Sequence, residues 1–128
     1  MKIDVDYLKL ILDKFIKSET QYINTQVFNS LLSDEYIEKF SFHWDILLDK
    51  NLILFSNGNL AKFIKRDSQG NITINHQIVR LNDFGYKFYE ALEEKEFLNK
   101  IKSNFKNISM DTLFKIANEF LENKVMDF

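Results

Sequence analysis

The chain has 128 residues, of which 45% are hydrophobic, and its 17 basic and 19 acidic side chains give a formal net charge of −2. This length and hydrophobic content predict one folded domain with a core of its own and argue against intrinsic disorder. Cysteine is absent, which excludes disulfides and thiolate metal sites, and the near-neutral charge gives no whole-chain signal for nucleic acid.

The first residues, MKIDVDYLKLILDKFIK, carry three aspartates among apolar side chains. Such a pattern predicts an amphipathic helix and not the uncharged apolar run of a signal peptide. No stretch approaches the ~18 uncharged apolar residues of a membrane span. We therefore expect a cytoplasmic protein without a membrane partner.

Three helices are predicted in the first half of the chain. The first covers residues 5–17, capped by Asp4 or Asp6, because apolar residues recur there at three- and four-residue spacing. A short second helix is predicted over 25–32. The third covers 34–49, and Asn51 can end it in a left-handed turn.

The apolar period then becomes typical of strands. A short β-type run at 52–55 is followed by an Asn-Gly turn signal. The segments Leu60–Lys65 and Ile72–Leu81 are both β-prone, and the loop between them contains Gly70, so they predict an antiparallel hairpin. Two further helices are predicted over 83–104 and 110–125.

This order predicts an α+β fold of the winged helix-turn-helix type, with a two-helix C-terminal extension. We expect a single domain over 1–128, made of a winged-helix core (1–81) and the extension (82–128). In this plan the third helix is the recognition helix, and residues 60–81 form the wing. The core prediction is that Phe40, Trp44, Leu47 and Leu48 face Leu8, Ile11, Leu12 and Phe15.

Three segments resemble a known family. They read FHWDILLDKNLI, VRLNDFGYKFYEAL and EFLNKIKSNFKNISMDTLFKIANEFL, and they follow an MKID start. Together they resemble the small bacterial and prophage proteins known as domain of unknown function 2513. Asn82 departs from the usual Thr of that family, and Tyr86 from the expected His. The resemblance implies a winged-helix fold and a phage or mobile-element setting, in which regulation or host takeover is the expected role.

No catalytic constellation, metal site or cofactor motif is present, so we expect a protein that is not an enzyme. We expect both histidines to have structural roles and not to form a binding or catalytic site. His43 lies on the apolar stripe of the third helix, which predicts a packed ring with a backbone partner. His76, between Asn75 and Gln77, is predicted to be a solvated strand residue.

The charge map separates the two candidate binding elements. Residues 33–51 have two bases, Lys39 and Lys50, and five acids, a net charge of −3; the acids are Asp34, Glu35, Glu38, Asp45 and Asp49. In the major groove, the carboxylates of such a helix would lie close to the DNA phosphates and would be repelled by them. Residues 60–81 carry one acid, Asp67, and a net charge of +3; the bases are Lys62, Lys65, Arg66 and Arg80. These four are the candidate contacts to a nucleic-acid backbone, and a hairpin with merely solubilising charges is the alternative.

Two functions therefore stay open. One is a DNA-binding transcription regulator that contacts double-stranded DNA through its wing. The other is an interaction module that binds a protein, such as a host factor, and no DNA. A homodimer through the C-terminal helices is predicted from Phe97, Phe105 and Phe120, which look surplus to one apolar stripe; the alternative is that these rings close the monomer's own core.

Overall fold

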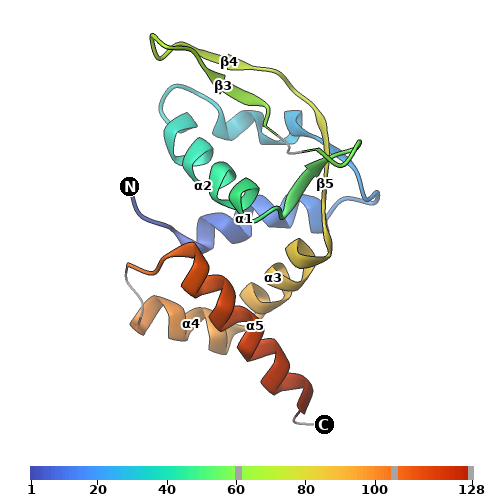
Figure 1. Ribbon diagram of the computed structural model, residues 1–128, viewed down its shortest axis with the longest axis vertical. Coiled ribbons are helices and arrows are strands. Elements are labelled where there is room, and N and C mark those ends of the chain that lie inside the picture. The colour runs from blue at the N-terminus through green and yellow to red at the C-terminus, as the bar shows by residue number, and fades with distance from the viewer. Residues whose placement is uncertain (60–61, 105–106, 127–128) are drawn as a thin grey trace.

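The computed structural model describes residues 1–59, 62–104 and 107–126, and the fold is α+β (Figure 1). Its elements in chain order are α1 (Val5–Ile16), β1 (Ile23–Asn24), the 3₁₀-helix η1 (Thr25–Leu31), α2 (Ile37–Asp49), β2 (Ile53–Phe55), β3 (Ile64–Arg66), β4 (Ile72–Ile74), β5 (Ile78–Leu81), α3 (Asp83–Glu93), α4 (Lys95–Asn104) and α5 (Met110–Met126). None of the helices among these residues is long and apolar enough to cross a membrane.

The strands form two small antiparallel sheets. One has the order β1-β5-β2, with Val79 of β5 opposite Ile23 on one side and Phe55 on the other. The other is the hairpin β3–β4, in which Ile64 pairs with Ile74 and Gly70 has a φ of +83°. The predicted hairpin is thus confirmed over these strands, while Leu60 lies outside the described residues.

The predicted strand over 72–81 is wrong as one continuous element, because it divides into β4 and β5. At Asn75 the backbone N–H still bonds to Phe63 of the hairpin, whereas two residues later the Gln77 carbonyl accepts from Thr25 beside β1. The chain therefore passes from one sheet to the other over 75–77. β5 is then drawn into the larger sheet, where its Val79 and Leu81 are buried.

A cluster of aromatic rings fills the centre of the molecule. Trp44 lies 5.0 Å from Phe63, 5.5 Å from Phe28 and 5.6 Å from Phe40, measured between ring centroids, and 6.4 Å from Phe15. The eight residues that were predicted to face inward from the first and third helices are all buried, as expected. The two helical stripes therefore point into one core.

The end of α2 follows the sequence prediction closely. Asn51 has a φ of +57°, and its N–H bonds to the Leu48 carbonyl, while the Leu52 N–H bonds to the Leu47 carbonyl. This pair of bonds is the Schellman motif, which satisfies the last carbonyls of a helix.

The start of α2 is later than predicted, because residues 33–36 form a turn whose Ser33 carbonyl accepts from Tyr36 and Ile37. The predicted second helix is the 3₁₀-helix η1.

The helix predicted over 83–104 is wrong as a single element and consists of α3 and α4, with Glu94 in an extended conformation between them (ψ 115°). The spacing of its apolar residues explains the break. Leu92 and Phe97 would point about 140° apart on a continuous helix of 3.6 residues per turn. Both are buried here, because the break at Glu94 reorients α4.

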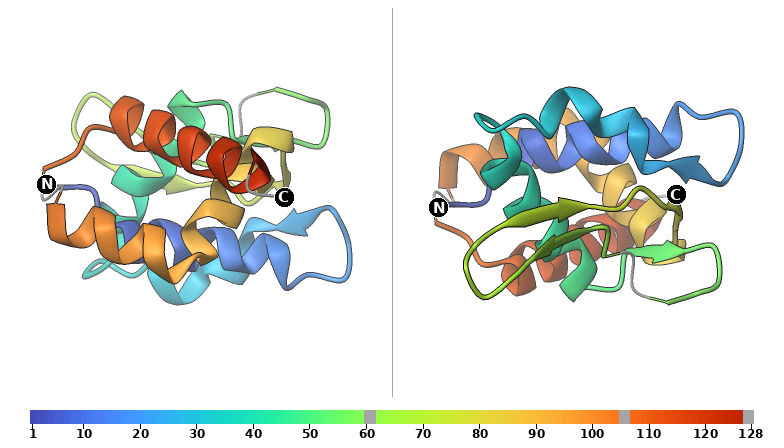
Figure 2. Two further views of the ribbon diagram at one scale, coloured as in Figure 1. Left: turned by 90° about the horizontal axis from the view of Figure 1, so that it is seen from below. Right: turned by 90° about the horizontal axis from the view of Figure 1, so that it is seen from above.

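The C-terminal helices form a second layer. α3 packs against α1, α4 and α5, and Figure 2 shows α4 and α5 on the face opposite the β3–β4 hairpin. One continuous cluster of buried residues runs from Val5 to Ala117. The extension and the first 81 residues therefore share a core.

Candidate nucleic-acid and protein interfaces

The four basic residues predicted to contact nucleic acid differ in their exposure and in their bonds within the protein. Lys62 and Lys65 are exposed. The Arg66 guanidinium bonds to the Glu38 carboxylate of α2 at 2.8 Å, and Arg80 is half-buried in the other sheet, where its Nη1 donates to the Leu81 carbonyl at 3.4 Å. Two of the four cations are therefore already engaged within the protein, and two are free to meet a phosphate backbone.

The hairpin lies over α2, as the view from above in Figure 2 shows, and it covers a helix with an acidic outward side. Glu38, Phe42, Asp45 and Asp49 follow one another at spacings of four, three and four residues, which places them in one line along α2. The three acids are exposed and Phe42 is half-buried. We call these four residues the outer stripe of α2.

The cations nearest to the outer stripe are mostly paired elsewhere. Lys39 bonds to the Asp4 carboxylate at 3.0 Å, and Lys50 pairs with Asp111 of α5. Among the described cations, Arg66 forms an ion pair with the stripe, at Glu38, and Lys62 acts on Asp45 without forming an ion pair. Within the described part of the chain, Asp45 and Asp49 form no ion pair, so the C-terminal half of the stripe presents unneutralised carboxylates.

The pKa of the Asp45 carboxyl is raised, and the main cause is its partial burial. The charge of Asp49 raises that pKa further, and Lys62 and Arg66 of the hairpin oppose the shift. A raised carboxyl pKa means that the ionised form is less stable here than in water. A cation supplied from outside would relieve this, so the stripe is suited to a basic partner.

A shallow groove of about 230 Å³ adjoins the outer stripe where α2 meets the start of α5. Its lining mixes apolar and charged side chains, from Ile46, Asp49, Lys50, Ser109, Met110 and Asp111. Together with half-buried Phe42 and Ile46, these residues place partly exposed apolar surface beside acidic side chains. Apolar contact surrounded by complementary charge is the usual composition of a protein interface.

The predicted packing of His43 is confirmed: the ring is fully buried and both nitrogens meet backbone groups, at Lys39 and Asp4. The prediction for His76 is wrong. His76 is half-buried between β4 and β5, its Nδ1 lies 2.9 Å from the hydroxyl of buried Thr25, and its ring stacks on Phe63. The Thr25 hydroxyl oxygen also accepts from the Gln77 N–H at 3.0 Å, so this side chain links η1 to the segment between β4 and β5. Thr25 precedes His76 by 51 residues, and no local signal indicates their contact.

The aromatic residues proposed for a dimer interface also differ from one another. Phe97 is 1% exposed and packs 5.2 Å from Phe120, so this ring is not surplus but closes the chain's own core. Phe120 is half-buried, and Phe105 lies outside the described residues. The homodimer therefore stays a prediction, with Phe120 as its described residue.

No group of three or more potential metal ligands occurs among the residues that the structure describes. Comparison of the chain with known proteins found no matching family model, curated protein or solved structure. The resemblance to domain of unknown function 2513 thus stays a prediction that rests on the three segments quoted above.

Proposed function

We propose that the chain is a winged-helix domain followed by the helices α3, α4 and α5, in which α2 stands for the recognition helix and β3–β4 for the wing. The order of the elements supports this proposal. Three helical segments precede the hairpin, and the hairpin is inserted between β2 and β5, two neighbouring strands of a three-stranded sheet. In this proposal the recognition helix is α2, which also carries the outer stripe.

We infer that this domain is a cytoplasmic, non-enzymatic protein that binds another protein through the outer stripe of α2. The observation that carries this function is the contact between Arg66 and Glu38. The wing cation Arg66 pairs with one carboxylate of the recognition helix, while Asp45 and Asp49 stay exposed without an ion pair among the described residues. Phosphates would be repelled by these carboxylates, whereas a basic surface with an apolar side chain for Phe42 would complement them.

Binding of a cationic amphipathic helix tests this function. We expect a synthetic peptide of Lys and Leu in helical amphipathic order to shift the amide resonances of Phe42, Asp45 and Asp49. The double variant Asp45→Lys/Asp49→Lys should weaken binding at least about tenfold, equivalent to about 1.4 kcal/mol. Nuclear magnetic resonance titration at constant ionic strength measures both effects.

The matched control reverses two exposed acids on α5, Glu119→Lys and Glu122→Lys. It makes the same change in net charge away from the stripe, so binding should be nearly unchanged. An equal loss of affinity in both double variants would reduce the interaction to general charge attraction and would contradict the proposed surface.

A second candidate function is weak binding of duplex DNA through the hairpin, favoured by the exposure of Lys62 and Lys65. A regulator of this kind would use a homodimer to present two wings to two half-sites. The same cations are equally compatible with a hairpin edge that resists aggregation. This function therefore needs a direct measurement.

Fluorescence anisotropy with a random DNA duplex at low salt measures this affinity. If DNA is bound, we expect weak affinity that the triple change Lys62→Ala/Lys65→Ala/Arg66→Ala reduces, with the salt slope flattened by about one unit for each lost phosphate contact. Lys39→Ala is the control, because that side chain pairs with Asp4 on another face. Submicromolar affinity that survives the triple change would place the DNA surface elsewhere.

A further inference from the structure

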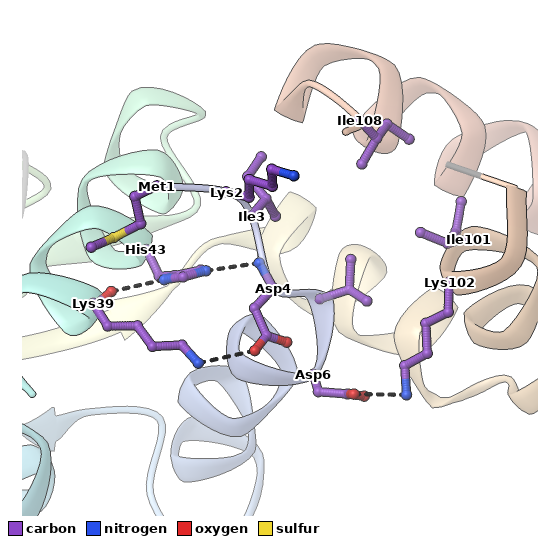
Figure 3. Close-up of a pocket in the computed structure, with 11 residues that line it drawn as sticks. Met1, Lys2, Ile3, Asp4, Asp6, Lys39, His43, Ile101, Lys102 and Ile108 are labelled. Carbon is purple, nitrogen blue, oxygen red and sulfur yellow. Dashed lines mark hydrogen bonds and ion pairs between the residues drawn. The ribbon is translucent and has the colours of Figure 1, made fainter. Parts of the chain in front are cut away.

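The segment before α1, residues 1–4, lies across α2 and lines a cleft of about 570 Å³ (Figure 3). The other lining residues come from the start of α1, from α2, from α4 and from the segment before α5. Apolar side chains, among them Ile3, Ile101 and Ile108, face the cleft, and the Asp6–Lys102 ion pair (2.7 Å) spans one side of it. The position of residues 1–4 therefore decides how open this cleft is.

Two bonds from Asp4 hold this segment to α2. Its backbone N–H donates to Nε2 of His43 at 2.9 Å, and its carboxylate pairs with Lys39 Nζ at 3.0 Å. The other ring nitrogen of His43, Nδ1, lies 2.7 Å from the Lys39 carbonyl, one turn earlier in α2. Figure 3 shows the imidazole between these two backbone groups.

These partners allow only one protonation state of the ring. The Lys39 carbonyl can only accept, so Nδ1 must carry a proton, and the Asp4 amide can only donate, so Nε2 must be bare. A second proton on the imidazole would set the Nε2–H against the Asp4 N–H, two donors facing each other in a buried site. The bond from Asp4 to His43 therefore exists only while His43 is neutral.

We propose that residues 1–4 are an acid-released latch, which His43 holds in place when neutral and frees when protonated. Release breaks the backbone bond of Asp4 to His43, and between Asp4 and α2 it leaves only the exposed ion pair with Lys39, a weak kind of contact. Asp4 still caps α1, where it accepts from the Tyr7 N–H, so residues 1–3 make the larger movement. The segment then leaves the cleft wall and uncovers Ile101 and Ile108. The core around Trp44 is not part of this movement.

Three parts of the chain place titratable groups around the imidazole: the N-terminal segment, α2 and α1. Asp4 faces it from the N-terminal segment and Lys39 from α2, while the Tyr7 ring of α1 packs 4.8 Å away and also lies under Lys39 Nζ. Asp6 and Lys102 line the same cleft and are paired with each other. Burial lowers the pKa of His43, the bond to the Lys39 carbonyl and the charge of Asp4 raise it, and the charge of Lys39 lowers it.

A histidine pKa that is lowered in the closed state gives stability that is complete above its ordinary value of 6.5 and is lost as the pH falls below it. Between 6.5 and the lowered pKa, the population of the released segment should rise about tenfold for each pH unit. Below the lowered pKa the population should level off, because both states then carry the proton.

Hydrogen exchange of the Asp4 amide, corrected for the intrinsic pH dependence of exchange, measures release. We expect its protection to fall about tenfold per pH unit in that window, together with titration of the His43 ring resonances and shifts of the Ile101 and Ile108 methyl groups. Trp44 fluorescence should stay constant over the same range. A simultaneous change of Trp44 would mean general unfolding, and full protection of Asp4 down to pH 4 would mean that no latch exists.

Substitutions of Asp4 and of Lys39 should change the pH dependence of release in opposite directions. Both substitutions break the same ion pair, so loss of that pair alone would change release in the same direction in both variants. Asp4→Asn removes a charge that favours the imidazolium, so the pKa of His43 in the closed state falls further, and release should level off at a lower pH after a larger total loss of protection. Lys39→Gln removes a charge that opposes the imidazolium, so release should level off at a higher pH after a smaller loss. His43→Gln should abolish the transition, and His76→Gln should leave it unchanged. Shifts in the same direction for the first two variants, or a transition that survives His43→Gln, would overturn the proposal.

Discussion

Replacing Trp44 by Ala should lower the free energy of unfolding by about 3–5 kcal/mol, as the removal of a fully buried aromatic side chain does. Trp44 is 1% exposed, and four other rings, Phe15, Phe28, Phe40 and Phe63, lie within 6.4 Å of it. These rings come from α1, η1, α2 and the hairpin segment, so the cavity would lie where several elements meet. Such a site has little room to collapse around a missing indole.

Urea unfolding followed by circular dichroism measures the loss. The control is Phe84→Ala, which removes a ring that is 53% exposed and has the Lys87 ammonium over its face. That variant should stay within about 1 kcal/mol of wild type, because cation–π contacts at exposed sites contribute no more than this. An unchanged unfolding midpoint for Trp44→Ala would show that the aromatic cluster does not hold the fold together.

Gly85→Ala should destabilise the protein by about 1–3 kcal/mol, the usual cost of overpacking, even though Ala is the better helix former by about 1 kcal/mol. A Cβ at this position would lie 2.9 Å from the Leu52 carbonyl oxygen and 3.1 and 3.2 Å from side-chain atoms of Leu81. The Leu52 carbonyl cannot move freely, because it also accepts the Asn82 N–H at 3.0 Å. The steric cost therefore exceeds the gain in helix propensity.

The comparison for this variant is Tyr86→Ala, one residue further along α3 and 40% exposed. It should change the unfolding free energy by less than Gly85→Ala, since a surface substitution usually costs within about 0.5 kcal/mol. Thermal unfolding of both variants decides the matter. A Gly85→Ala protein that melts at or above the wild-type temperature would show that α3 can move away from Leu52 at no cost.

The contact at Gly85 joins the two parts of the chain. Asn82 caps α3 by accepting from the Gly85 N–H at 2.9 Å, and its side-chain amide donates to the Asn51 carbonyl. The turn that ends α2 is thus bonded to the start of α3. Asn is one of the residue types favoured at this capping position.

Local patterns in the sequence were sufficient wherever one element determines its own structure. The apolar spacing of 5–17 and 34–49 predicted α1 and most of α2, because helical period and burial go together. Asn51 predicted the left-handed turn, and Gly70 the loop of the hairpin, because few residue types adopt a positive φ without strain. The acidic character of α2 and the exposure of Lys62 and Lys65 also follow from the sequence.

The tertiary structure alone decided how these elements pair. Arg66 meets Glu38 across 28 residues, His43 meets Asp4 across 39, and β5 leaves the hairpin to join β1 and β2. A residue pattern reports which side of an element is buried, but it does not report which other element covers that side. Those partners are selected by the packing of the whole core, and that packing bonded two of the four predicted DNA contacts, Arg66 and Arg80, to other parts of the protein and buried Phe97.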